Sequence, residues 1–145
     1  MNQEEYLRQI AQLQQRNWPA DIPREASYSF GEVLLTDHLR RWAEIQPDKA
    51  AYIYYGSEIS YRTLNAQSDA LAALLALHGV RKGERVAVFL GNCPQFVVAF
   101  YAILKLGAVH VPVNPLFKEA ELVYELQDTG AKVAIVQDQL MPMVR

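Results

Sequence analysis

From Arg85 onward the sequence alternates short apolar runs with longer helical segments, and this alternation constrains the fold more than any other feature. Val86–Leu90 is uninterrupted apolar, as expected of a strand covered on both faces. Two further strands are predicted at residues 109–111 and 133–136. The strands start about two dozen residues apart, which leaves room for one crossover helix each time. The sequence therefore predicts an α/β fold, with a βαβαβ unit and a parallel sheet.

The segments between these strands carry helix signals. Pro94 suits the first turn of a helix that runs to Leu106, and Gly107 closes it. A second helix is predicted at residues 118–128, ended by Gly130. After the third strand, residues 137–145 give no convincing helix. Because a buried parallel sheet usually has more than three strands and helices on both faces, we expect a partial sheet completed by a longer chain.

A hairpin and a long helix are predicted ahead of this unit. Residues 50–55 and 58–60 form the hairpin strands, with Gly56-Ser57 as the turn. Ser60 can cap a helix over residues 61–77 that ends before Gly79. The leucines expected on the inward face of this helix are Leu64, Leu71, Leu74 and Leu75.

A boundary between a leader and a globular part is predicted at residue 32. An amphipathic helix is predicted at residues 4–16, with an irregular leader over residues 17–31 that contains Pro19 and Pro23. Thr36 is the expected N-cap of a helix over 37–45. We therefore predict a helical leader at 1–32 and a globular part at 33–145. The apolar side chains expected on the two helices are Tyr6, Leu7, Ile10 and Leu13, and then Leu39, Trp42 and Ala43.

Composition excludes several classes of protein. A hydrophobic content of 51% supports a core, and a net charge of −2 without a charge block argues against a nucleic-acid partner. Cys93 is the only cysteine, so neither an intramolecular disulfide nor a cysteine-based zinc cluster can form. The start is polar, unlike a secretory signal, and the longest apolar run, Phe96–Leu104, is about half the length of a membrane span. A cytoplasmic protein without a transmembrane segment is expected.

No motif in the sequence identifies a reactive group. A phosphate loop needs clustered glycines followed by Lys and Ser or Thr, but all seven glycines are isolated and are best explained as turns or helix ends. Leu90-Gly91-Asn92 follows the first core strand, at the edge where α/β sheets bind ligands. Asn92 is therefore a candidate contact, although a loop residue that bonds its own backbone is the favoured interpretation.

The remaining polar candidates also have a structural explanation that is favoured. The histidines His38, His78 and His110 fall in three different predicted elements, without metal-ligand spacing or a carboxylate pair beside them. The basic run Arg81–Arg85 could contact phosphate, but a solvated turn is the simpler interpretation. Cys93, at a helix start, could be a reactive thiol or merely a small residue. No catalytic, cofactor-binding or metal-ligating residue is assigned.

Several segments together resemble the opening of the adenylate-forming (AMP-binding) superfamily. In chain order they read ISYRTLN at 59–65, LA at 71–72, HGVRKGERVAV at 78–88, NCPQF at 92–96, AILKLGAVHVPVNP at 102–115, EL at 121–122, Leu126 and DTGAK at 128–132. The resemblance covers about residues 33–137, and several ordered matches are more specific than one motif. VNPLF at 113–117 resembles the acyl-CoA synthetases, including fatty-acid–CoA ligases, whereas peptide-synthetase adenylation domains tend to carry Asp before that proline.

The resemblance implies an activity for a longer parent protein. Such enzymes join a carboxylate to AMP from ATP with Mg²⁺, and then pass the acyl group to the thiol of coenzyme A. The phosphate loop, the nucleotide contacts and the catalytic lysine of the family all come later than this segment, so the chain alone is expected to be catalytically silent and to bind no cofactor. Its partners would be the remainder of the enzyme and, for the parent, a small carboxylate.

Three alternatives stay open at this stage. The parent could activate a fatty acid or related carboxylate for coenzyme A, or an amino acid or aryl acid for a carrier protein. The chain could instead be a non-enzymatic α/β module that binds a ligand or partner. In each case an uncovered apolar sheet edge favours self-association of the isolated chain.

Overall fold

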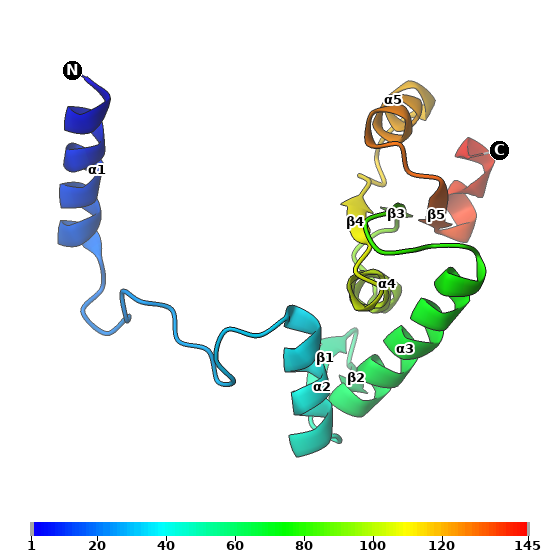
Figure 1. The fold of residues 1–145 in the computed structure, drawn as a ribbon, viewed down its shortest axis with the longest axis horizontal. Coiled ribbons are helices and arrows are strands. Elements are labelled where there is room, and N and C mark those ends of the chain that lie inside the picture. Colours follow the sequence, from blue (N-terminus) through cyan, green and yellow to red (C-terminus); the bar gives the residue numbers. More distant parts are fainter. Residues whose placement is uncertain (1, 145) are drawn as a thin grey trace. The chain divides into compact units, whose positions relative to one another are not determined.

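The computed structural model describes residues 2–144 (Figure 1). The chain divides after Glu32 into two compact units, which are described separately. Among the described residues, no helix combines the length and apolar character needed to cross a membrane.

The first unit consists of one helix and an irregular segment. Helix α1 spans Gln3–Asn17, close to the predicted range of 4–16. The side chain of Asn2 caps it by accepting a hydrogen bond from the backbone N–H of Glu5 at 2.8 Å. After the helix, the indole N–H of Trp18 donates to the carbonyl of Ile22 at 2.6 Å, which closes a local turn in the leader.

The second unit is built on a parallel sheet of three strands. Strand β3 spans Arg85–Phe89, β4 spans Val109–Pro112 and β5 spans Val133–Val136. Their order is β4-β3-β5, with both outer strands parallel to β3. The predicted α/β class and the three predicted strands are confirmed.

Strand β3 is buried on both faces because α4 (Pro94–Lys105) and α5 (Glu119–Thr129) lie on opposite sides of the sheet (Figure 1). Val86 and Val88 pack into a cluster with Ala99, Ala102 and Ile103 of α4. Ala87 and Phe89 point the other way and pack with Leu122 of α5. Alternate residues of one strand therefore supply both halves of the core.

Two further helices cover the α4 side, and each corrects one prediction. Helix α2 spans Leu35–Ile45 with Leu34 as its N-cap, so Thr36 is not the N-cap but a buried residue of the first turn. Helix α3 spans Tyr61–Leu77, and the Ser60 hydroxyl caps it as predicted by accepting from the N–H of Thr63 at 3.2 Å. Leu74, predicted to face inward, is half exposed. The buried positions of α3 are Leu64, Ser68, Ala72 and Leu75.

The predicted hairpin is present, but its turn lies one residue earlier than expected. Strand β1 spans Ala50–Tyr54 and β2 spans Ser57–Ser60, paired antiparallel. The turn residues are Tyr55 and Gly56, with φ of 47° and 82°. Two successive positive φ values define a mirror-image turn that matches the twist of the strands, so Ser57 belongs to the second strand.

The C-terminal segment also differs from the prediction. Asp138–Met143 forms a 3₁₀ helix, labelled η1, where no helix was expected. Pro142 lies inside this helix. Proline has no backbone N–H, but few hydrogen bonds are lost because 3₁₀ helices are short. Gly130 ends α5 with φ of 64°, as the sequence predicted.

Candidate functional site

The carboxyl ends of β3 and β5 form a topological switch point. After β3 the chain turns to α4, on one face of the sheet. After β5 it turns to η1, whose Leu140 and Met143 pack on the opposite face, with the α5 cluster. Because neighbouring strands lead to opposite faces, their loops separate and leave a crevice between them. Ligands of open α/β sheets bind in this position.

A crevice of about 400 Å³ lies at this switch point. Leu90, Cys93 and Gln95 follow β3, and Gln137 and Asp138 follow β5, which itself contributes Ile135 and Val136. The two sides are joined by a hydrogen bond of 3.1 Å from the backbone N–H of Gln137 to the carbonyl of Phe89.

The crevice combines an apolar wall with a polar rim. Leu90 and the end of β5 supply apolar surface, whereas amides and one carboxylate supply the rim. Asp138 accepts from the N–H of Gln139 at 2.9 Å, and the Gln137 amide donates to the Gln139 side chain at 3.3 Å. Among residues 2–144, no lysine or arginine lines the crevice. Such a surface can contact a neutral or mixed ligand, but it offers no positive charge to a phosphate.

The structure brings two of the sequence candidates to this edge. Asn92 and Cys93 line a neighbouring cavity of about 240 Å³, and Cys93 also lines the crevice. The hairpin closes the other side of this cavity with Tyr52 and Tyr54, and the Tyr52 hydroxyl lies 3.5 Å from the carbonyl oxygen of Pro94. Sequence reasoning missed these tyrosines because nothing local signals that the hairpin lies against the start of α4.

The three histidines do not come together. His38 lies in α2, His78 follows α3 and His110 lies in β4. No group of three or more His, Cys, Asp or Glu side chains in the part of the chain that the structure describes could hold a metal ion.

His110 is nevertheless unusual, because its ring lies between those of Phe96 and Phe100, each at a centroid distance of 5.3 Å. Its Nε2 is buried without a hydrogen-bond partner among the described residues. Burial lowers the pKa of His110 below 6.5, against a smaller opposing effect of its own backbone. The neutral ring therefore serves as a packing element of the α4–β4 contact.

The basic turn at residues 81–85 is tied to the end of α3. The Arg81 guanidinium donates to the carbonyl of Ala76 at 2.9 Å, and the Glu84 carboxylate accepts from the Arg81 N–H at 2.6 Å. A hollow of about 340 Å³ beside this turn is lined by Arg85 and Val133, the first residues of β3 and β5. It therefore lies at the amino ends of the strands, away from the switch point.

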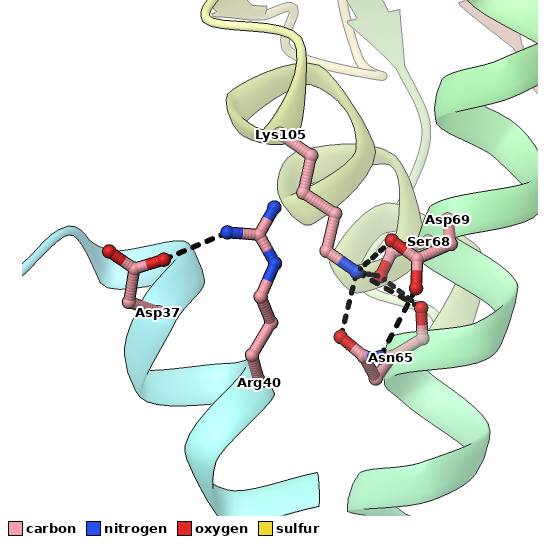
Figure 2. A network of polar contacts seen from close by, with 6 residues as sticks. All are labelled: Asp37, Arg40, Asn65, Ser68, Asp69 and Lys105. Carbon is pink, nitrogen blue, oxygen red and sulfur yellow. Dashed lines mark hydrogen bonds and ion pairs between the residues drawn. The ribbon is translucent and has the colours of Figure 1, made fainter.

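The most extensive polar network joins α4 to α3 (Figure 2). Lys105, the last residue of α4, has a side chain only 3% exposed. Its ammonium lies 2.7 Å from the Asp69 carboxylate, 2.8 Å from the Ser68 hydroxyl, and 3.0 and 2.8 Å from the carbonyl and side-chain oxygens of Asn65. Because these oxygens accept hydrogen bonds from every N–H group of the ammonium, we assign the network a structural role.

Three influences act on the pKa of the Lys105 amine, which is lowered on balance. Burial lowers its pKa, Asp69 raises it, and the nearby Arg40 lowers it slightly. Arg40 is itself held by Asp37 at 2.8 Å (Figure 2). The network fixes the end of the helix whose first turn borders the switch-point crevice.

Comparison with known proteins agrees with this architecture. The sequence model described as AMP-binding enzyme matches residues 39–145. A long-chain-fatty-acid–CoA ligase of Bacillus subtilis is 39% identical over 127 residues, which are 86% of this chain and 22% of that protein. The chain thus spans about a fifth of the length of the curated relatives it matches.

Solved structures give the same result at the level of the fold. A fatty acyl CoA synthetase of Mycobacterium tuberculosis matches with a TM-score of 0.71 and 33% identity, over 75% of this chain and 22% of that one. An anthranilate CoA ligase in complex with anthranoyl-AMP matches with a TM-score of 0.72 and 31% identity, over 75% and 21%.

Proposed function

The chain belongs to the AMP-binding enzyme family, and from that premise we propose that it is the N-terminal part of an AMP-forming acyl-CoA ligase. The parent would join a carboxylate to AMP and then to coenzyme A, in the cytoplasm. The observation that carries the proposal is the family match over residues 39–145. The crevice at the switch point of the sheet is consistent with it. The 39% identity to a long-chain-fatty-acid–CoA ligase supports a fatty acid or a related carboxylate as substrate.

We further propose that this chain alone does not catalyse the reaction. An ATP site needs backbone N–H groups or cations that converge on the phosphates, and a divalent metal needs clustered carboxylates. The described residues at the switch point do not fit these requirements, since those that line the crevice provide one carboxylate, two amides and no cation. The role we assign to the chain is therefore that of a scaffold, and no step of the reaction is routed through its residues.

A second candidate substrate class is an aryl acid. It is supported by the similarity to an anthranilate CoA ligase, whose TM-score of 0.72 matches that of the fatty acyl relative.

The proposal can be tested by comparing this chain with a version extended along its gene. Substrate-dependent exchange of pyrophosphate into ATP would be measured with dodecanoate and with anthranilate, followed by thioester formation with coenzyme A. We expect activity only in the extended protein, and faster exchange with dodecanoate. Exchange catalysed by the 145-residue chain would contradict the scaffold role. Transfer to a carrier protein but not to coenzyme A would contradict the assignment as a CoA ligase.

A further inference from the structure

Strand β4 lies at one edge of the parallel sheet. Among the described residues it pairs with β3 alone, so its outer edge is open. The N–H of Val109 donates to the carbonyl of Glu84 at 2.7 Å, and the N–H of Val113 donates to the carbonyl of Val88 at 3.0 Å. A short edge strand with one neighbour is the kind of element that can open while the remaining sheet stays folded.

The contact between β4 and α4 is made by the ring of His110. His110 is the register partner of Val86, whose side chain packs toward α4, so the imidazole lies on the α4 side of the sheet as well. Its ring meets those of Phe96 and Phe100 at interplanar angles of 82° and 76°. Such edge-to-face packing suits a neutral aromatic ring. The buried Nε2 has no hydrogen-bond partner among the described residues, so nothing there accepts a second N–H.

The elements packed against this ring offer no counter-ion for a positive charge. Their ionisable side chains are Tyr101 and Lys105 in α4 and Arg85 in β3. Burial raises the pKa of Tyr101, which therefore stays neutral, and the Lys105 ammonium is bound by oxygens of α3. Arg85 is a cation. An imidazolium at His110 would thus be partly buried without compensation, which is unfavourable.

We propose that protonation of His110 releases the edge strand β4 from α4 and β3 while the rest of the second unit stays folded. Release brings the charged ring into water and so removes the cost of burying it. It also frees Phe96, which lines the cavity beside the switch point together with Tyr52 and Tyr54. Mildly acidic conditions therefore alter the wall of that cavity. The proposal does not depend on the proposed ligase activity.

Amide hydrogen exchange of the 145-residue chain at pH 7.5 and pH 5.5 tests the release. The reporters are the N–H groups of Val109 and Val113, with that of Gln137, which donates to the carbonyl of Phe89 beside β5, as the internal control. Protection factors correct for the intrinsic effect of pH on exchange. At the two valines they should fall about tenfold, because a free ring with the usual pKa of 6.5 gains about that factor of protonation. Low urea should not change the fall, since local opening exposes little surface. Gln137 should stay within about twofold.

Variants of the histidine identify the group that responds. His110→Phe keeps an aromatic ring and His110→Gln a neutral polar side chain, and each should abolish the pH dependence at Val109 and Val113. His78→Gln removes an exposed histidine and should leave that dependence unchanged.

Three results would overturn the proposal. Equal protection of the parent chain at both pH values would mean that the two phenyl rings accommodate the cation. A fall that persists in both His110 variants would assign the acid response to another group. A fall of the same size at Gln137, or one that grows with urea, would indicate loosening of the whole unit instead of release of β4.

Discussion

Lys105 and Asp69 join the end of α4 to the middle of α3 through an ion pair of 2.7 Å, in which the lysine side chain is 3% exposed and the aspartate side chain 55%. The asymmetry matters, because the cation depends on protein oxygens whereas the carboxylate remains hydrated. The pair therefore stabilises one buried charge, the Lys105 ammonium, which also donates hydrogen bonds to Asn65 and Ser68.

The first prediction concerns this buried cation. Lys105→Met should lower the free energy of unfolding by about 2 kcal/mol, because Ser68 and the carbonyl of Asn65 lose a charged donor in a region closed to water. Urea denaturation of the 145-residue chain measures the change. Arg62→Met is the matched control, since Arg62 pairs with Asp48 at 3.2 Å in an exposed setting and should cost less than about 0.5 kcal/mol. Equal stabilities of the two variants would refute the role assigned to Lys105.

The second prediction concerns pH. Burial lowers the pKa of His110 below 6.5, so between the two values the unfolded chain binds a proton that the folded chain does not. The free energy of unfolding should therefore fall as the pH decreases from 6.5 toward the lowered folded-state pKa, and level off below it. His110→Phe, flanked by two phenylalanine rings, should remove this part of the slope.

Urea midpoints at pH 7.5 and pH 5.5 provide the measurement for His110. His78 is exposed and lies outside β4, so His78→Gln is the matched control for replacing one histidine. If His110→Phe and the parent chain lose the same stability between the two pH values, another group is responsible for the acid sensitivity.

The third prediction concerns the core between α4 and the sheet. Ile103 is 0% exposed and packs in the cluster with Val86 and Val88. Ile103→Ala should cost about 3 kcal/mol through lost burial and the cavity left behind. Leu77→Ala removes a side chain of similar size that is 85% exposed, and should cost well under about 1 kcal/mol. A similar shift in urea midpoint for both would contradict the assigned core.

The sheet and most helix ends could be predicted because their signals are local. An uninterrupted apolar run indicates a strand buried on both faces, and β3 is such a strand. Ser60 and Gly130 act as caps through bonds and dihedral angles that involve only near neighbours. The family resemblance, which rests on ordered segments within about residues 33–137, was likewise confirmed by the family match over residues 39–145.

The inward face of α3 was predicted correctly at Leu64, Leu71 and Leu75 but not at Leu74, and the buried Ser68 was missed, for which Lys105 is the reason. Leu74 has the apolar character of a core residue, yet Ser68 is the residue with 0% exposure. The serine hydroxyl is needed inside because the ammonium that it accepts from lies 37 positions later in the chain. The β3 side of the switch-point crevice was predicted, at Leu90-Gly91-Asn92, but the other side was not, since it requires knowing that β5 lies beside β3.

The last prediction concerns the hairpin turn. Tyr55 holds φ at 47°, a conformation that residues other than Gly, Asn and Asp rarely adopt, and its side chain is 93% exposed. Tyr55→Asn creates the Asn-Gly pair favoured in such turns and should raise the free energy of unfolding by about 0.5 kcal/mol, even though it removes the ring contact with Tyr54. Gly56→Ala, at φ of 82°, should lower it by about 1 kcal/mol, although nothing lies within 4 Å of the added carbon. Opposite signs of the two shifts in urea midpoint support the turn at Tyr55-Gly56. A turn at Gly56-Ser57 would leave Tyr55 in an extended strand, and Tyr55→Asn would then destabilise the chain, because asparagine is a poor strand former.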